Sequence, residues 1–264
     1  MSGTASYKQI ASKTPLSERL VTKGMTLYLK TAVILSGGLG TRLMPFTQAI
    51  PKPLLPVGEK AILEIQIERF VRFGFRQIYL ATNYKSDYIG NFIGNGAKYG
   101  AQVHISREKK PLGTAGPLKL LKSNLCDPFL VMNGDILTLA DLTRLYEFGC
   151  SVDAQMTVAI KKVVTPFDFG NIRFSGDYVA GIEEKPNITS FAVAGIYVVK
   201  PELLALIPDE TYFGMDSLML KMLKSGMKIA KYEINEYWLD IGNMENYDKA
   251  QRDAASFTDG DKNA

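Results

Sequence analysis

The sequence is short of the residues on which several common kinds of site depend. It contains one histidine and two cysteines among 264 residues. A single histidine rules out a metal site built from several histidines and leaves a histidine-based triad without support. His104 stands in an alternating segment and is predicted to be an ordinary strand residue. Cys126 and Cys150 lack metal-ligand spacing, so we expect free thiols in a reducing cytoplasm.

Long apolar runs and a charge of one sign are also lacking. No segment approaches the roughly 18 apolar residues of a membrane helix, and the N-terminus has no apolar signal segment. The 31 basic and 27 acidic residues leave a net charge of +4, with no basic stripe. The composition therefore predicts a cytoplasmic protein that binds neither nucleic acid nor a membrane.

The remaining composition is that of a globular protein, with 46% hydrophobic residues. We expect one domain over residues 30–252 because no linker divides it. Residues 1–29 are polar and predict a flexible leader with at most one short helix, over 15–21. Residues 253–264 are expected to form a C-terminal tail.

Strand and helix patterns alternate in the first half of the domain. This order predicts an α/β fold with a mostly parallel sheet, whose ligands bind outside the carboxyl ends of the strands. The second half is richer in strands, which we expect to extend the same sheet. Strands are predicted at 31–35, 77–81, 101–106, 129–133, 154–160, 171–174, 178–182, 192–199 and 228–233, and helices at 61–73, 86–92, 115–122, 201–207 and 216–225.

The first strand leads into an unusual loop, LSGGLGTRLMPFTQAIPKPLLPVG, at residues 35–58. Glycines after a strand suit a phosphate cradle of backbone N–H groups. The loop is not a P-loop, and Leu43 replaces the third glycine of a dinucleotide fingerprint. Arg42 offers a planar fork to phosphate oxygens. Lys52 stands between Pro51 and Pro53, which restrict its backbone and aim its side chain.

Two aspartates follow apolar runs far apart in the sequence. Asp135 ends the segment FLVMNGD, and Asp240 lies in YWLDIG. Either alone is a common turn residue. Two carboxylates at strand ends, beside a phosphate loop, favour a Mg²⁺ site, because magnesium takes one or two carboxylates together with substrate phosphates.

These segments together resemble the sugar-1-phosphate nucleotidyltransferases, and among them the hexose-1-phosphate guanylyltransferases of the mannose-1-phosphate type. The resemblance rests on the loop above and on KPLGTAGPL, FLVMNGD, GIEEKP, AGIYVV and YWLDIG, in the family's order from about residue 30 to 252. It implies a Rossmann-like nucleotidyltransferase fold. It also implies transfer of a nucleoside monophosphate from a triphosphate to a sugar 1-phosphate.

The resemblance assigns roles by position. Arg42, Lys52 and Asp135 would be catalytic, and Asp135 and Asp240 would bind Mg²⁺. Glu184 would hold sugar hydroxyls and Lys185 the sugar phosphate. The sugar pocket would also include Gly170 and Gly195. The nucleotide would lie against Leu35, Gly37, Gly38, Gly40, Thr41, Glu108, Leu112, Gly113, Thr114 and Gly134.

The residue inventory fits this chemistry independently. A sugar phosphate has a second pKa of about 6, so its attacking oxygen is already an anion at neutral pH. The reaction then needs positioning and charge neutralisation rather than a histidine base. The expected partners are a nucleoside triphosphate and a sugar 1-phosphate, and a homo-oligomer stays open.

The base and the sugar are less defined. Glu108 can accept both N–H donors of guanine, which favours GTP, although a uracil or thymine N–H or a surface position would also suit it. Val193 replaces the asparagine usual in guanylyltransferases, and Phe169-Gly170-Asn171 replaces Tyr-Gly-Val. Mannose is therefore a default, and glucosamine, glucose and heptose 1-phosphates stay open.

Three other functions are weighed against transfer. Leu137 breaks the Asp-x-Asp pattern of related glycosyltransferases, and the missing third glycine argues against an oxidoreductase. A non-catalytic regulatory paralogue should have lost a catalytic cation or a metal aspartate, and all are present. Uridylyl or thymidylyl transfer remains an alternative to guanylyl transfer.

Overall fold

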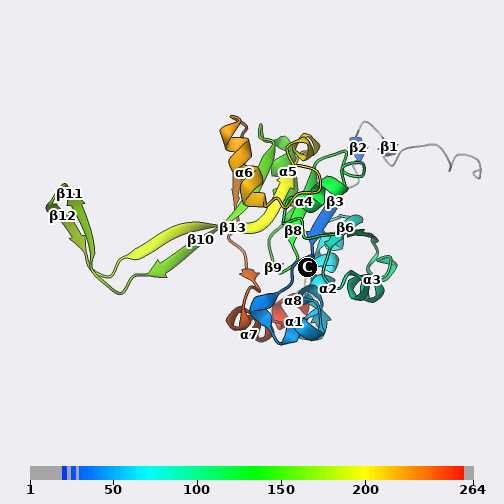
Figure 1. Ribbon diagram of the computed structural model, residues 1–264, viewed down its shortest axis with the longest axis horizontal. Helices are drawn as coiled ribbons and strands as arrows, with labels where there is room; N and C mark the ends of the chain where they lie inside the picture. Colours follow the sequence, from blue (N-terminus) through cyan, green and yellow to red (C-terminus); the bar gives the residue numbers. More distant parts are fainter. Residues whose placement is uncertain (1–19, 23–24, 28–29, 259–264) are drawn as a thin grey trace, which may run out of the picture.

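A seven-stranded sheet forms the centre of the molecule (Figure 1). The computed structural model describes residues 20–22, 25–27 and 30–258. The strand order is β14-β10-β13-β8-β3-β6-β7, and all neighbouring pairs are parallel except the two that contain β13. The expected mixed, mostly parallel sheet is thus confirmed. Its strands are β3 (Thr31–Leu35), β6 (Gln77–Thr82), β7 (Gln102–Arg107), β8 (Phe129–Asn133), β10 (Met156–Pro166), β13 (Asn187–Val199) and β14 (Ile229–Glu233).

Helices cover both faces of the sheet. Successive side chains of a strand point to opposite faces of the sheet. In β3, Ala32 and Ile34 accordingly belong to one apolar core and Val33 to the other, so both faces must be covered. On the first face lie α2 (Ile62–Arg72), α3 (Ser86–Ile93) and α5 (Leu142–Ser151). On the second lie α4 (Gly116–Leu120), η4 (Pro201–Ala205) and α6 (Met215–Lys224).

A third, smaller core anchors the glycine-rich loop. Leu43 and Leu55 from the loop pack there with Leu137, Leu239 and Tyr247. The loop is therefore fixed at both ends by buried side chains. The surrounding elements are η1 (Thr41–Leu43), α1 (Phe46–Ala49), η2 (Lys52–Leu54), β4 (Pro56–Val57), β5 (Lys60–Ala61), β9 (Ile136–Thr138), β15 (Trp238–Asp240), α7 (Met244–Arg252) and α8 (Ala255–Thr258). The short η3 (Ala97–Tyr99) packs against the first core instead.

Strands β10 and β13 continue beyond the sheet as a two-stranded ribbon. At its far end, β11 (Asn171–Ser175) pairs with β12 (Tyr178–Glu183) as a sheet of their own (Figure 1). These two strands were expected in the main sheet, and that expectation is wrong. The physical reason is a register shift between Val158 and Ile160. Such bulges bend a strand, and the ribbon leaves the sheet there.

Two further features bear on the sequence-based expectations. Most of residues 1–29 lie outside the described residues, but β1 (Leu20–Thr22) pairs with β2 (Met25–Leu27), so a helix over 15–21 does not include residues 20 and 21. Helix α5 was not predicted. Within the described part of the chain, no helix has the length and apolar character needed to cross a membrane.

Candidate functional site

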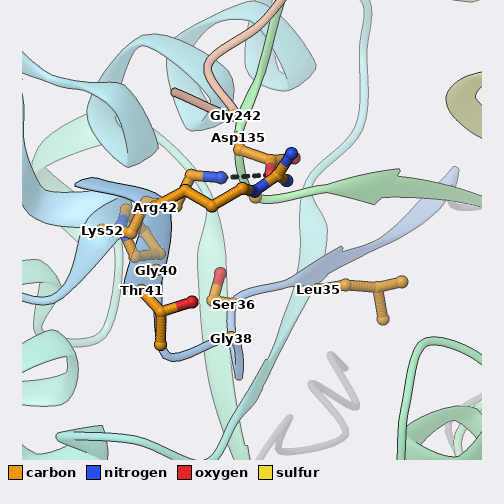
Figure 2. Close-up of a pocket in the computed structure, with 11 residues that line it drawn as sticks. Leu35, Ser36, Gly38, Gly40, Thr41, Arg42, Lys52, Asp135 and Gly242 are labelled. Carbon is orange, nitrogen blue, oxygen red and sulfur yellow. Dashed lines mark hydrogen bonds and ion pairs between the residues drawn. The ribbon is translucent and has the colours of Figure 1, made fainter. Parts of the chain in front are cut away.

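Two adjoining cavities open at the carboxyl ends of β3, β6 and β8, where parallel sheets place their ligands. Their volumes are about 240 and 440 Å³, and they share the glycine-rich loop and Asp135. The smaller cavity (Figure 2) is lined by Leu35, Ser36, Gly38, Gly40, Thr41, Arg42, Lys52, Pro53, Gly134, Asp135 and Gly242. The larger is lined by Leu35, Gly37–Thr41, Ala81, Asn83, Glu108, Pro111–Thr114, Pro117, Asn133, Asp135 and Tyr212.

The glycine-rich loop wraps closely around Thr47. Thr47 is 1% exposed, and its hydroxyl donates to the Gly40 carbonyl at 2.9 Å. Gly40 has φ 65°, and a Cβ there would lie 2.8 Å from the Thr47 methyl group. Only glycine fits this left-handed, crowded position. The loop therefore keeps its backbone near the cavity, as a phosphate cradle requires.

Lys52 and Arg42 place two cations beside one aspartate. Lys52 is only 9% exposed, and its Nζ forms an ion pair with Asp135 (Figure 2). Its place in η2, between Pro51 and Pro53, fixes the direction of the side chain. The Arg42 guanidinium lies on the same side of the cavity, next to Gly242. Arg42, Lys52 and Asp135 thus lie together on one cavity, which their sequence separation alone does not require.

Asp240 reaches the same place from the other end of the chain. Strand β15 pairs with β9, and the Ile241 amide donates to the Asp135 carbonyl at 2.9 Å. Asn246 holds the Asp240 carbonyl at 2.6 Å. Burial and the nearby charge of Asp135 raise the pKa of Asp240, while Lys52 and Arg42 oppose this shift. The two aspartates are thus neighbours in space.

The aspartate pair fits a divalent cation. One Asp240 carboxylate oxygen is buried and has no hydrogen-bond partner, and a cation would satisfy it while relieving the repulsion between the two carboxylates. Among the described residues, no group of three or more His, Cys, Asp or Glu side chains is placed to hold a metal. Two carboxylates suffice for magnesium when phosphates complete its coordination.

The turn that carries Asp135 depends on a close backbone approach. The Gly134 amide donates to the Leu35 carbonyl at 2.9 Å, and a Cβ on Gly134 would lie 2.7 Å from that oxygen. Any side chain would push β8 away from β3 at this point. Gly134 thereby brings Asp135 to the start of the glycine-rich loop, at Leu35 and Ser36.

Glu108 lies on the wall of the larger cavity. Its carboxylate accepts a 2.9 Å hydrogen bond from the Leu112 amide and lies against Gly37. Burial raises the pKa of Glu108, and the Leu112 hydrogen bond opposes this shift. A half-buried carboxylate with one oxygen available is an acceptor suited to N–H donors of a ligand.

The segment that follows Glu108 is fastened to the start of α6. The Thr114 hydroxyl accepts from the Met215 amide at 2.8 Å, and the Ala115 and Gly116 amides donate to the Phe213 carbonyl. These contacts fix one wall of the larger cavity.

The structure separates the residues that the resemblance assigns to the sugar. Gly195 lies against the Asn133 amide, since a Cβ there would be 2.7 Å from Asn133 Nδ2, so it is beside the larger cavity. Gly170, Glu184 and Lys185 instead lie on the projecting ribbon and line neither cavity (Figure 1). All the other assigned residues line one of the cavities or, in the case of Asp240, lie next to them.

Several cavity residues were not anticipated from the sequence. Ser36 is 2% exposed, and its hydroxyl is buried without a partner at the wall of the smaller cavity. Asn83 and Asn133 lie at the ends of β6 and β8. The strand-end argument that selected the aspartates would also have found these two. Tyr212 comes from a distant segment and had no sequence signal.

Gln66, on α2, is a further residue that the sequence did not single out. It is 2% exposed, and its side-chain nitrogen donates to the carbonyls of Asn133 at 2.9 Å and Ile136 at 2.8 Å. These carbonyls flank Gly134 and Asp135. Gln66 thus positions the turn that presents the aspartate, without lining either cavity.

We expect Gln66→Leu to lower the free energy of unfolding by about 2–4 kcal/mol, because two buried carbonyls lose their donor. For the nucleotidyl transfer that the sequence resemblance implies, the displaced Asp135 should also lower the rate by about 10- to 100-fold, with a smaller effect on nucleotide affinity. Thermal melts and a comparison of kcat with KM would measure this. Gln77→Leu, at the opposite end of the sheet, is the matched control and should change neither. An unchanged kcat in a folded Gln66→Leu protein would contradict the positioning role.

Comparison with known proteins agrees with this geometry. Residues 31–256 match the sequence profile described as nucleotidyl transferase. The chain is 32% identical over 223 residues to a mannose-1-phosphate guanyltransferase of Yarrowia lipolytica, covering 81% of this chain and 61% of that protein. It is 34% identical over 224 residues to the protein of the same name in Pichia angusta, with the same coverage. The chain spans about three fifths of the length of these curated relatives.

Solved structures share the fold. A putative glucose-1-phosphate thymidylyltransferase of Bacillus anthracis, crystallised with a sucrose, is 25% identical with a TM-score of 0.70 over 85% of this chain and 95% of that one. HddC of Yersinia pseudotuberculosis, in complex with GMP-PN, is 28% identical with a TM-score of 0.66, covering 84% of this chain and 98% of that one.

Proposed function

The chain belongs to the nucleotidyl transferase family, and from this premise we propose that it transfers a nucleoside monophosphate, GMP from GTP by preference, to a sugar 1-phosphate. One observation supports this most strongly. The glycine-rich loop with its two cations, the mid-domain Asp135 and the C-terminal Asp240 converge on one pair of cavities.

The proposed reaction needs no general base. An oxygen of the sugar phosphate attacks the α-phosphorus of the nucleotide, a new P–O bond forms, and the bond to the β-phosphate breaks with its electrons leaving on pyrophosphate. Because the attacking oxygen is already anionic, the chain's task is to neutralise charge and align the groups. In the proposed reaction Lys52 contacts the reacting phosphates and Arg42 the departing ones.

Magnesium is proposed as the cofactor, held by Asp135 and Asp240. A bound Mg²⁺ would supply charge neutralisation and polarisation of the phosphoryl group. The chain's own contribution is the buried position of Asp240 and the turn that presents Asp135. Gly195 is proposed on the sugar side, together with Gly170, Glu184 and Lys185 of the ribbon.

The preference for guanine rests on Glu108. The carboxylate can accept from N1–H and the 2-amino group of guanine with its two oxygens, because the oxygen that accepts from the Leu112 amide keeps a second lone pair. Uracil and thymine offer one N–H. Relatives named guanyltransferases agree with this choice. The solved thymidylyltransferase neighbour keeps the pyrimidine nucleotides as the alternative that a test must include.

Pyrophosphate release tests the proposal directly. The purified protein would be supplied with Mg²⁺ and five triphosphates (GTP, UTP, dTTP, CTP and ATP), each with the 1-phosphates of mannose, glucosamine, glucose and a heptose. We expect turnover with GTP and one sugar. Turnover with UTP or dTTP alone would correct the base, and silence with every pair despite nucleotide binding would favour a regulatory paralogue.

We expect Glu108→Gln to lower kcat/KM for GTP by roughly 10- to 100-fold, since an acceptor pair for the base is lost, and to affect UTP less. The same change should raise the melting temperature at pH 7. The folded-state pKa of Glu108 lies above its ordinary value of 4.5, so the ionised form disfavours folding. The gain in stability of the Glu108→Gln variant should be complete at a pH above the folded-state pKa of Glu108. It should vanish at a pH below the ordinary pKa of 4.5. A melting temperature equally raised at pH 3.5 would contradict the burial argument.

A further inference from the structure

Residues 163–190 of the ribbon form an arm that projects from the body (Figure 1). Its strand pairing runs in unbroken register from Val163 opposite Ser190 to Pro166 opposite Asn187. Within the described residues, every hydrogen bond, ion pair and ring contact of the arm lies inside the arm. Figure 1 shows it projecting away from β3, β8 and β9, which carry the site residues.

The arm exposes a large apolar surface. Phe169, Phe174 and Tyr178 are 70%, 75% and 80% exposed, and Val179 and Ile182 are 69% and 67% exposed. A two-stranded hairpin is marginal by itself in water, and exposed apolar patches of this extent mark contact surfaces. The arm therefore needs a surface that this chain's body does not provide in the described conformation.

The arm also carries a preformed polar cluster. Gly170 and Glu184 are close neighbours, since a Cβ on Gly170 would lie 3.2 Å from a Glu184 carboxylate oxygen, and Lys185 follows directly. These are the residues that the proposed function assigns to the sugar 1-phosphate. Neither cavity of the same chain contains any of them, so each chain presents the sugar-binding residues and the nucleotide-binding residues in two separate places.

The mouth of the site has an apolar surface to match the arm. Leu39 and Tyr212, on the wall of the larger cavity, are 53% and 71% exposed. Met44, Phe46 and Ile50, in the same loop region, are 43–48% exposed. Leu39 and Tyr212 thus give the larger cavity an exposed apolar rim, and the loop that carries Leu39 continues into the other three side chains.

We propose, on the basis of the proposed function, that the arm of one copy packs on the mouth of a second copy's cavities and places Glu184 and Lys185 against the sugar 1-phosphate there. Two copies related by a two-fold axis would complete each other's sites, since exchange of an identical element is a low-cost route to a dimer. The same arm folding onto its own cavities would require a second bend in the ribbon, whose pairing is unbroken from Ile160 opposite Val193 to Pro166 opposite Asn187.

The available area agrees with a stable dimer. A buried aromatic side chain contributes roughly 150–250 Å², so the three mostly exposed rings of one arm offer roughly 400 Å². Two reciprocal arms and the surfaces that they cover then bury about 1,600 Å², the size of a standard stable interface. The aliphatic residues of the arm add to this.

Complementation between two inactive variants tests the exchange. Lys185→Ala disables the arm and Asp135→Asn disables the cavity, and differently tagged copies would be co-expressed and purified as the mixed dimer. An exchanged arm gives one intact site per mixed dimer, so we expect about half of the wild-type rate. A mixed dimer no more active than the separate variants would overturn the proposal, because an arm acting in its own chain repairs nothing.

Light scattering gives a readout independent of activity. The full chain should have twice the 29.2 kDa mass of one copy, and the double variant Phe174→Ser/Tyr178→Ser should raise the dimer dissociation constant at least tenfold. Leu220→Ser/Leu223→Ser, which changes residues 56% and 60% exposed on α6, is the matched control and should remain dimeric. A monomeric wild-type protein would overturn the proposal. A protein that dimerises through the arm but is inactive with every substrate pair would overturn the proposed function and support the interface.

Discussion

Asp240→Asn is expected to lower the rate of nucleotidyl transfer by about 10²–10³-fold without lowering stability. The carboxylate has a buried oxygen with no partner and lies beside Asp135. The negative charge of Asp240 is therefore expected to contribute to the reaction only when a metal ion is bound. Initial rates across a range of Mg²⁺ concentrations would measure the loss, which higher Mg²⁺ should only partly recover.

The stability of the same variant gives a second, opposite signature. Because burial and Asp135 raise the folded-state pKa of Asp240, its ionised form disfavours folding at neutral pH. Removing the charge should raise the melting temperature at pH 7, and this gain should disappear as the pH falls below the ordinary pKa of 3.8. Asp87→Asn, at a carboxylate 74% exposed in a surface ion pair, is the control and should change neither rate nor stability. A normal rate for Asp240→Asn in Mg²⁺ would remove the metal assignment.

Lys52→Met should reduce the single-turnover rate by about 10²–10³-fold, the usual effect of removing one preorganised group that stabilises charge in a transition state. Methionine keeps the volume of the side chain and removes only the ammonium group. The binding of nucleotide should weaken much less, because the glycine-rich loop and Arg42 remain. Rapid quench with saturating GTP, together with a separate binding titration, would distinguish the two effects.

The loss of Lys52 has a further consequence for the carboxylates. Lys52 is the ion-pair partner of Asp135, so its removal leaves the two aspartates without their nearest cation. The variant should consequently show a steeper dependence on Mg²⁺. Lys224→Met, at an exposed lysine in the last turn of α6, is the control. Equal losses in binding and in single-turnover rate would show that Lys52 serves nucleotide affinity rather than the reaction.

Local features of the sequence were enough for most of the fold. Strand β8 matches its predicted bounds, and α2 and β6 match theirs within one residue, because apolar periodicity and glycine or proline boundaries act over a few residues. Helix α5 escaped prediction even though Asp141 caps it and Leu142 and Leu145 face the core. Its Thr, Tyr, Phe, Gly and Cys residues have low helix propensity, and tertiary packing supplies what propensity does not.

The sequence likewise predicted the chemical character of the site, although not its geometry. The loop with Arg42 and Lys52, and the two strand-end aspartates, were chosen for their residue types and neighbours. The sequence could not predict that these residues meet in one site. Their meeting depends on the pairing of β9 with β15, which lie about a hundred residues apart in the chain. Gln66 and Tyr212 illustrate the same limit, because neither has a local pattern that reveals its neighbours in space.

By itself, then, the sequence determined the strands of the main sheet, four of the helices (α2, α3, α4 and α6) and the character of the phosphate-binding loop. All of these arise from interactions between residues close in the chain. The tertiary structure alone decided that Asp135, Asp240, Arg42 and Lys52 share one site and that residues 163–190 leave the body. The direction of a ribbon depends on a bulge and on the surfaces available to it, and these are contacts between residues distant in the sequence.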